Sequence, residues 1–243
     1  MSALVLGATG LCGSFFLKYS LAAPTLKHVY TLTRRPLDQK KSESEEEAEA
    51  EAKLTSIVNK ESSEWKNVIE RDIEGQIDYL FTALATTRAA AGGLDNQYKI
   101  DHDLNLELAK VAKAKGCKTL VVISSSGASV DSRLPYFRMK GEIERDLVAL
   151  GFERTIILRP GALLGERRAD SAKGFLNDFA VGFTGFFYRK PFLQRMAMYP
   201  VYGEEVSQVG VHLALGKDDD NKQKVRIVES KEILEIAASL KKN

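Results

Sequence analysis

The first thirteen residues constrain the fold more than any other part of the chain. An apolar run at residues 3–6 has the length of a buried strand, and the turn Gly7-Ala8-Thr9-Gly10-Leu11-Cys12-Gly13 follows it. Phe15, Phe16 and Leu17 then begin a helix-like segment. Glycines at such a turn let the backbone bend tightly and approach a pyrophosphate, while the helix start attracts phosphate. This order predicts a dinucleotide-binding βαβ unit whose turn, Gly7 with Thr9 to Gly13, contacts the cofactor.

The end of the next apolar run indicates which nucleotide binds. Residues 28–33 predict the second strand, and Arg34 and Arg35 follow it. In NAD enzymes an acidic residue near this position bonds the ribose hydroxyls, whereas arginine accommodates a 2′-phosphate. Because no Asp or Glu ends this strand, we expect NADPH, with Arg34 as the better candidate of the two. A solvated pair of charges before Pro36 is the alternative.

Strand and helix patterns alternate along the rest of the chain. Strands are predicted at residues 77–84, 119–123, 155–158 and 225–228, and helices at 104–112, 141–150, 206–215 and 233–240. Such alternation predicts one α/β domain over residues 1–243, a Rossmann-type doubly wound parallel sheet with a small C-terminal substrate-covering region. Ligands of such sheets bind at the carboxyl ends of the strands.

Two further segments are predicted to approach the nucleotide. Ala85, Thr86 and Thr87 follow the strand at 77–84 and should line the path of the cofactor. Residues 69–73 are interpreted as a short strand that brings Asp72 to the adenine edge. The acidic residues of Asp101-His102-Asp103, by contrast, are interpreted as favourable charges at a helix start.

A Tyr-x-x-x-Lys pair supplies candidate chemistry. Tyr136 and Lys140 lie four residues apart at a predicted helix start, so they share one face. A nearby ammonium favours the phenolate, and the tyrosine can then protonate a carbonyl oxygen as a hydride arrives. Ser125, at a strand end, is the first candidate to orient that oxygen, and Ser126 is the second. A tyrosine that only packs at a helix start is the alternative.

Charge and composition exclude several classes of protein. With 35 Lys and Arg against 33 Asp and Glu, the chain lacks the basic excess of a nucleic-acid-binding surface. The presence of only two cysteines is typical of a protein in a reducing compartment. The three histidines do not have the spacing of metal ligands. We expect no signal peptide, because the predicted strand begins at the amino terminus. Residues 38–53 carry seven acids and three lysines and are interpreted as a low-complexity insertion that forms a mobile loop or a solvated helix extension.

Residues 162–205 are unusually aromatic. Nine Phe and Tyr side chains fall between positions 175 and 202, and no acid stands between Phe179 and Tyr199. We interpret the region as a lid over the substrate, with a membrane-facing surface or a homo-oligomer interface as alternatives. No run is long and apolar enough to span a bilayer.

Together these motifs resemble those of the Tat-interacting oxidoreductase-like family, an atypical branch of the short-chain dehydrogenases/reductases. The resemblance rests on the glycine turn, on Ser124-Ser125 and Tyr136 to Lys140, and on the runs at 81–95 and 158–167, which are most similar to fungal members. It implies a Rossmann fold that binds NADPH, with Pro160 among the contacts. It also implies a peripheral position on the mitochondrial outer membrane, facing the cytosol.

The sequence thus predicts an NADPH-dependent reductase of a small carbonyl compound, with Ser125, Tyr136 and Lys140 as the catalytic residues. The alternative is a catalytically silent scaffold or sensor that binds NADPH at the mitochondrial surface. Neither hypothesis involves nucleic acid or a metal.

Overall fold

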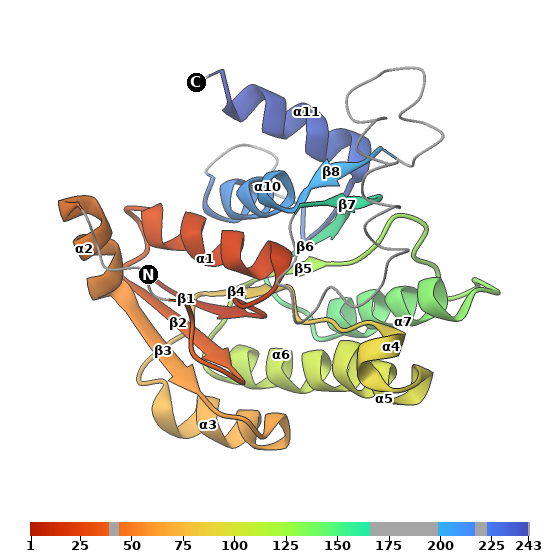
Figure 1. Cartoon of the computed structure of the whole chain (residues 1–243), viewed down its shortest axis with the longest axis horizontal. Coiled ribbons are helices and arrows are strands. Elements are labelled where there is room, and N and C mark those ends of the chain that lie inside the picture. Colours follow the sequence, from red (N-terminus) through yellow and green to blue (C-terminus); the bar gives the residue numbers. More distant parts are fainter. Residues whose placement is uncertain (39–43, 166–198, 217–222, 243) are drawn as a thin grey trace.

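A parallel sheet organises the molecule (Figure 1). The computed structural model describes residues 1–38, 44–165, 199–216 and 223–242. Seven strands pair in the order β3-β2-β1-β4-β5-β6-β9, and all of these pairs are parallel. The strands are β1 (Ser2–Leu6), β2 (His28–Thr33), β3 (Leu54–Val58), β4 (Tyr79–Thr82), β5 (Thr119–Ile123), β6 (Arg154–Arg159) and β9 (Val225–Glu229). The strand order reverses between β1 and β4, as the predicted doubly wound fold requires.

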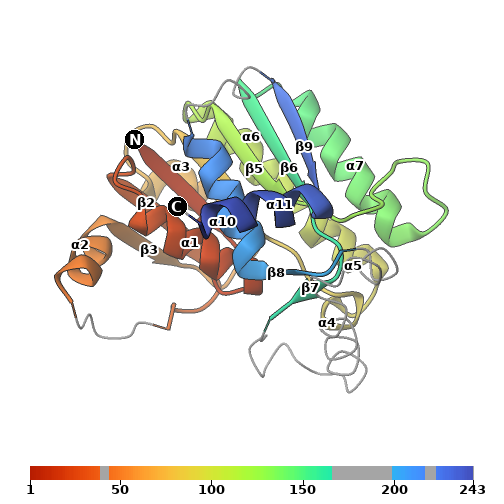
Figure 2. The same cartoon turned by 90° about the horizontal axis from the view of Figure 1, so that it is seen from above.

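Helices cover both faces of this sheet (Figures 1 and 2). One face carries α1 (Leu11–Ala22), α10 (Gly203–Leu215) and α11 (Ser230–Leu240), and the other carries α3 (Trp65–Asp72), α6 (Asn105–Ala114) and α7 (Pro135–Ala149). Successive side chains of a strand point to opposite faces. Accordingly Ala3 and Val5 pack with Phe16 in one core, whereas Leu4 and Leu6 pack with Trp65 in the other.

Shorter elements complete the described part of the chain. They are α2 (Glu45–Lys53), a 3₁₀ turn (Ser62–Glu64), α4 (Arg88–Ala91), α5 (Leu94–Tyr98), a π-helical turn (Lys99–Leu104), and the two-stranded parallel pair β7 (Leu163–Leu164) and β8 (Val201–Tyr202). None of the helices in the described ranges is long and apolar enough to cross a membrane. Residues 166–198, which hold most of the predicted aromatic region, lie outside the described residues.

Part of the acidic tract is helical, as the interpretation of a solvated helix extension expects. Residues 45–53 form α2, which runs directly into β3, and β3 pairs in parallel with β2. Parallel neighbours need a crossover connection, and α2 lies within that connection. The Lys53 ammonium donates to the main-chain oxygen of Leu21, 3.2 Å away, and thereby joins α2 to α1. Residues 39–43 of the tract lie outside the described residues.

The prediction for Asp72 is wrong. Residues 69–73 do not form a strand, because Trp65–Asp72 is the amphipathic helix α3, with Trp65, Val68 and Ile69 buried. Asp72 ends this helix on the protein surface and pairs with Arg71 at 2.5 Å. That guanidinium lowers the pKa of the Asp72 carboxyl. Since α3 leads back toward the start of β4, Asp72 lies near the amino ends of the strands, away from the glycine turn.

Candidate nucleotide and catalytic site

The glycine turn joins β1 to α1 at the carboxyl edge of the sheet. The Gly10 amide donates to the Gly7 main-chain oxygen at 2.8 Å, and Gly7 has a φ of +80°, which favours glycine. A Cβ on Gly13 would lie 1.9 Å from the Gly7 oxygen, and one on Gly7 would lie 2.8 Å from the main chain of Ala83. The first and third glycines are therefore required by contacts within the protein itself.

The start of α1 is suited to an anion. Gly10 is its exposed N-cap residue, and its first turn carries no acidic side chain. The amides of a first helical turn have no partner within the helix, and the positive end of the helix dipole lies at the turn. Leu11 and Cys12 turn their side chains toward α10: Leu11 contacts Gly203, and the Cys12 main-chain oxygen accepts from the Ser207 hydroxyl at 2.8 Å. The nucleotide contacts expected of these two residues would come from their backbone.

Arg34 and Arg35 follow β2 at the same edge. Because Leu6 of β1 pairs with Leu32 of β2, the two arginines stand beside the glycine turn. Arg34 is exposed and Arg35 is half-buried, and the Thr33 hydroxyl donates to the Arg35 main-chain oxygen at 2.7 Å. An exposed guanidinium in this position is available to a phosphate group.

The segment after β4 is held by side chains of the following helical elements. The Thr86 amide donates to Asp101 Oδ1 at 2.7 Å, and Gln97 Nε2 donates to the Thr86 oxygen at 3.0 Å. The Thr87 hydroxyl accepts from the Ala90 amide at 3.1 Å and caps α4. Ala85 and Thr87 are exposed at this edge, so the predicted cofactor-lining segment has a fixed backbone and an open surface.

Tyr136 and Lys140 share one face of α7, as their spacing predicts. Tyr136 is 42% exposed, whereas Lys140 is 5% exposed. The Lys140 Nζ lies 5.9 Å from the centroid of the Tyr136 ring. Lys140 also forms an ion pair with Asp101, with Nζ 3.1 Å from Oδ2. The arrangement places a buried ammonium behind a solvent-facing phenol.

The three consecutive serines at the end of β5 have different environments. Ser124 is buried and its hydroxyl donates to Glu144, which also accepts from the Arg159 guanidinium at 2.6 Å. The hydrogen bonding of the Arg159 guanidinium to the Glu144 carboxylate raises the pKa of Arg159. Ser125 is half-buried, and its hydroxyl makes a long contact of 3.4 Å with the main-chain oxygen of Ser126. Ser124 is thus committed to the protein, while Ser125 remains available to a substrate.

The segment after these serines packs on the start of α7. The Ser126 amide donates to the Pro160 oxygen at 2.8 Å, which joins the ends of β5 and β6. The Ser129 amide donates to the Phe137 oxygen at 3.1 Å, and a Cβ on Gly141 would lie 2.3 Å from the Ser129 main chain. These contacts bring the serine segment and the Tyr136 turn to one corner of the sheet edge.

Two acidic residues of this corner escaped the sequence analysis. Asp101 was assigned to a helix start, but it is 1% exposed inside a π-helical turn and contacts both Thr86 and Lys140. Glu144 is 6% exposed and binds Ser124 and Arg159. One available signal was the spacing of Glu144, which stands four residues after Lys140 on the same helix.

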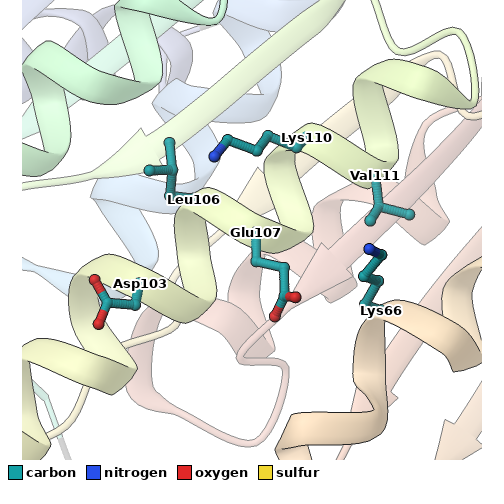
Figure 3. Close-up of a pocket in the computed structure, with 6 residues that line it drawn as sticks. All are labelled: Lys66, Asp103, Leu106, Glu107, Lys110 and Val111. Atoms are coloured by element: carbon teal, nitrogen blue, oxygen red, sulfur yellow. The ribbon is translucent and has the colours of Figure 1, made fainter.

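A separate pocket lies on the outer side of the helices, between α3 and α6 (Figure 3). Its lining residues are Lys66, Asp103, Leu106, Glu107, Lys110 and Val111. The pocket shares no residue with the glycine turn, the arginines or the Tyr136 corner, and its charges are of both signs. In the described parts of the chain no group of His, Cys, Asp and Glu has the arrangement of a metal site.

Comparisons with solved structures agree with this fold. The chain superimposes on "MoeE5 in complex with UDP-glucose and NAD" with a TM-score of 0.62 at 18% identity, covering 99% of this chain and 82% of that one. It superimposes on "short chain dehydrogenase from Mycobacterium paratuberculosis bound to NAD" with a TM-score of 0.64 at 13% identity, covering 96% and 97%. The fold is therefore the Rossmann-type fold that these two proteins have.

Sequence relatives define the family more narrowly. A family model described as HIM1 matches residues 73–189. "Protein FMP52, mitochondrial" of Saccharomyces cerevisiae is 52% identical over 242 residues, covering 100% of this chain and 99% of that protein. The protein of the same name from Kluyveromyces lactis is 51% identical over 238 residues, covering 98% and 99%. The chain belongs to the FMP52 family of fungal proteins, whose named members are mitochondrial.

Proposed function

We propose that this protein reduces a small carbonyl compound with NADPH. The observation that carries the proposal is the corner where buried Lys140 lies behind exposed Tyr136, on which the segment that follows half-buried Ser125 packs. A fold alone does not define a reaction, so the proposal depends on these side chains. The resemblance to the Tat-interacting oxidoreductase-like proteins supports the same assignment.

The residues at the glycine turn fit a dinucleotide. Only a side chain as small as hydrogen fits at Gly13, and the start of α1 offers amides to a pyrophosphate. Arg34 and Arg35 would hold the 2′-phosphate of NADPH, and Ala85, Thr86, Thr87 and Pro160 would line the rest of its path. When bound, NADPH supplies the hydride.

The catalytic roles follow from the exposure of each group. Tyr136 is exposed, and its hydroxyl would protonate the oxygen of the carbonyl substrate. The Lys140 ammonium would stabilise the resulting phenolate and bond the nicotinamide ribose. The Ser125 hydroxyl would donate to the same carbonyl oxygen and so orient it. An oxygen held by two donors is polarised for hydride addition at its carbon.

The proposal includes the subcellular location of the protein. Relatives named as mitochondrial support a mitochondrial site. We propose a peripheral position on the cytosolic side of the outer membrane, as the resemblance to the fungal proteins implies. Contact with the membrane surface or with a second copy of the chain would involve the aromatic region at 162–205.

Replacing Tyr136 by phenylalanine tests the mechanism. With a carbonyl-compound panel and NADPH absorbance as the readout, Tyr136→Phe should lower turnover by about 10²-fold or more, because the proton donor is lost. NADPH affinity should stay close to that of the wild type. Tyr30→Phe is the matched control, since the Tyr30 hydroxyl makes a 3.4 Å contact with Glu74 far from the corner. Unchanged turnover in Tyr136→Phe would refute the mechanism.

The scaffold hypothesis predicts a different result in the same assay. The wild type would bind NADPH but oxidise none of it with any carbonyl compound in the panel. Thermal stabilisation by NADPH cannot separate the two hypotheses, because any ligand of the native state raises the unfolding temperature.

A further inference from the structure

Asp101 contacts both halves of the proposed site. Its Oδ1 accepts from the Thr86 amide at 2.7 Å, and its Oδ2 accepts from Lys140 Nζ at 3.1 Å. Thr86 belongs to the segment that would line the nucleotide, whereas Lys140 is the proposed partner of Tyr136. One carboxylate therefore touches the binding half and the catalytic half at the same time.

The backbone of Asp101 is fixed by the same elements. Asn105 Nδ2 donates to the Asp101 main-chain oxygen at 2.9 Å and to the Leu84 oxygen at 2.8 Å. The Thr82 hydroxyl donates to Asn105 Oδ1 at 2.5 Å. The widened π-helical turn at Lys99–Leu104 is a feature found frequently at functional sites, and here it directs Asp101 toward the sheet edge.

Burial makes the two charges depend on each other. The side chains of Lys140 and Asp101 are 6% and 1% exposed. A buried charge without a partner is strongly unfavourable, so removing either group destabilises the position of the other. The ammonium has three N–H bonds, and the bond to Asp101 fixes the direction of the other two.

We propose that Asp101 is a positioning residue that couples the nucleotide-lining segment at Thr86 to Lys140. Its carboxylate holds the Lys140 ammonium behind Tyr136 while it holds the Thr86 amide at the path of the nucleotide. Movement at one contact therefore changes the other. The inference rests on the proposed function, because the role of Lys140 in proton transfer comes from there.

The coupling can be measured without turnover. Amide hydrogen exchange at Thr86, followed by NMR, should become about tenfold faster in Lys140→Met, although Lys140 does not touch that amide, because the unpaired Asp101 carboxylate leaves its position. Lys140→Arg keeps the charge and should retain slow exchange. Exchange at Val121, in the buried strand β5, reports global unfolding and corrects for any loss of stability.

Activity provides the second readout. Asp101→Asn keeps an oxygen for the Thr86 amide but removes the counter-charge of Lys140. It should lower kcat about tenfold, shift the pH profile of kcat, and change KM for the carbonyl compound little. Asp103→Asn is the matched control, because Asp103 lies two residues further along, its side chain is 57% exposed, and it contacts His102. It should behave as the wild type.

The outcomes separate the two proposals. The rate of amide exchange at Thr86, corrected with the rate at Val121, is compared between Lys140→Met and the wild type. Equal rates would overturn the coupling even if Tyr136 proves essential. Faster exchange at Thr86 in a protein that oxidises no NADPH would support the coupling and refute the reductase proposal. A kcat and pH profile of Asp101→Asn equal to those of Asp103→Asn would also count against Asp101 as a positioning residue.

Discussion

Replacing Gly13 by alanine tests the structural basis of the glycine turn. The new Cβ would lie 1.9 Å from the Gly7 oxygen and 2.4 Å from the Gly7 carbonyl carbon, where ordinary contact begins at 3.4 Å. Either α1 or the turn must therefore move by roughly 1.5 Å. Both clashing atoms belong to the main chain, so no side-chain rotation can relieve the contact.

The size of the effect follows from this overlap. Overpacking costs about 1–3 kcal/mol in typical cores, and a main-chain clash belongs at the upper end. For a chain of this length, about 3 kcal/mol lowers the Tm by about 6–12 °C. Since the displaced turn also carries the amides proposed to bind the phosphates, NADPH affinity should fall by more than about tenfold. Circular dichroism melting and a fluorescence titration measure the two effects.

Gly10→Ala is the matched comparison within the same turn. Its Cβ would lie 3.2 Å from the Gly7 oxygen, and Gly10 has an extended backbone that alanine adopts readily. This variant should keep nearly the Tm of the wild type and lose NADPH affinity, because its methyl group would stand where the nucleotide is proposed to bind. A Gly13→Ala protein with the Tm of the wild type would refute the packing argument.

Two further predictions concern buried groups. Burial raises the pKa of the Cys117 thiol to about 12, whereas an unfolded thiol ionises near pH 8.5. Between about pH 9 and 12 the unfolded chain loses a proton that the folded chain keeps, so this group lowers the free energy of unfolding by up to about 1.4 kcal/mol per pH unit. In urea unfolding, the free energy of unfolding of Cys117→Ala should depend less steeply on pH over this range than that of the wild type. An unchanged dependence on pH would contradict the raised pKa of Cys117. At the end of β5, Ser125→Ala should lower turnover with little loss of stability. Ser124→Ala should lower the free energy of unfolding by about 1–3 kcal/mol, because it removes a hydrogen-bond donor from buried Glu144. Loss of turnover in Ser124→Ala and loss of stability in Ser125→Ala would contradict the roles given to the two serines.

Much of the fold was predictable from local patterns. The strands at 119–123 and 225–228 and the helices near 206–215 and 233–240 lie within a few residues of the observed elements. The apolar run at 119–123 and the periodicity of the two helices match their burial in a sheet covered on both faces. The glycine turn was predictable because its spacing reflects contacts of main-chain atoms with each other.

The errors occurred where local composition and tertiary context disagree. Ile69 and Ile73 suggested a strand. Instead, Ile69 lies on the buried side of α3, and Ile73 is the buried residue that follows the end of this helix. Asp101 resembles an ordinary helix-start acid until the π-helical turn brings it to Lys140, and that contact spans 39 residues. Such partners depend on the assembled sheet edge.

The most direct test of the central claim, that Arg34 and Arg35 select NADPH, is a binding titration. The wild type and the double variant Arg34→Ala/Arg35→Ala are each titrated with NADPH and with NADH. Hydrogen bonds to charged groups contribute about 1.5–3 kcal/mol, so loss of the arginines should weaken NADPH binding by about 10- to 100-fold and leave NADH affinity nearly unchanged. The wild type should bind NADPH more tightly than NADH. Equal affinities in the wild type, or a double variant that keeps its NADPH affinity, would contradict the assignment of this edge to an NADPH-dependent reductase.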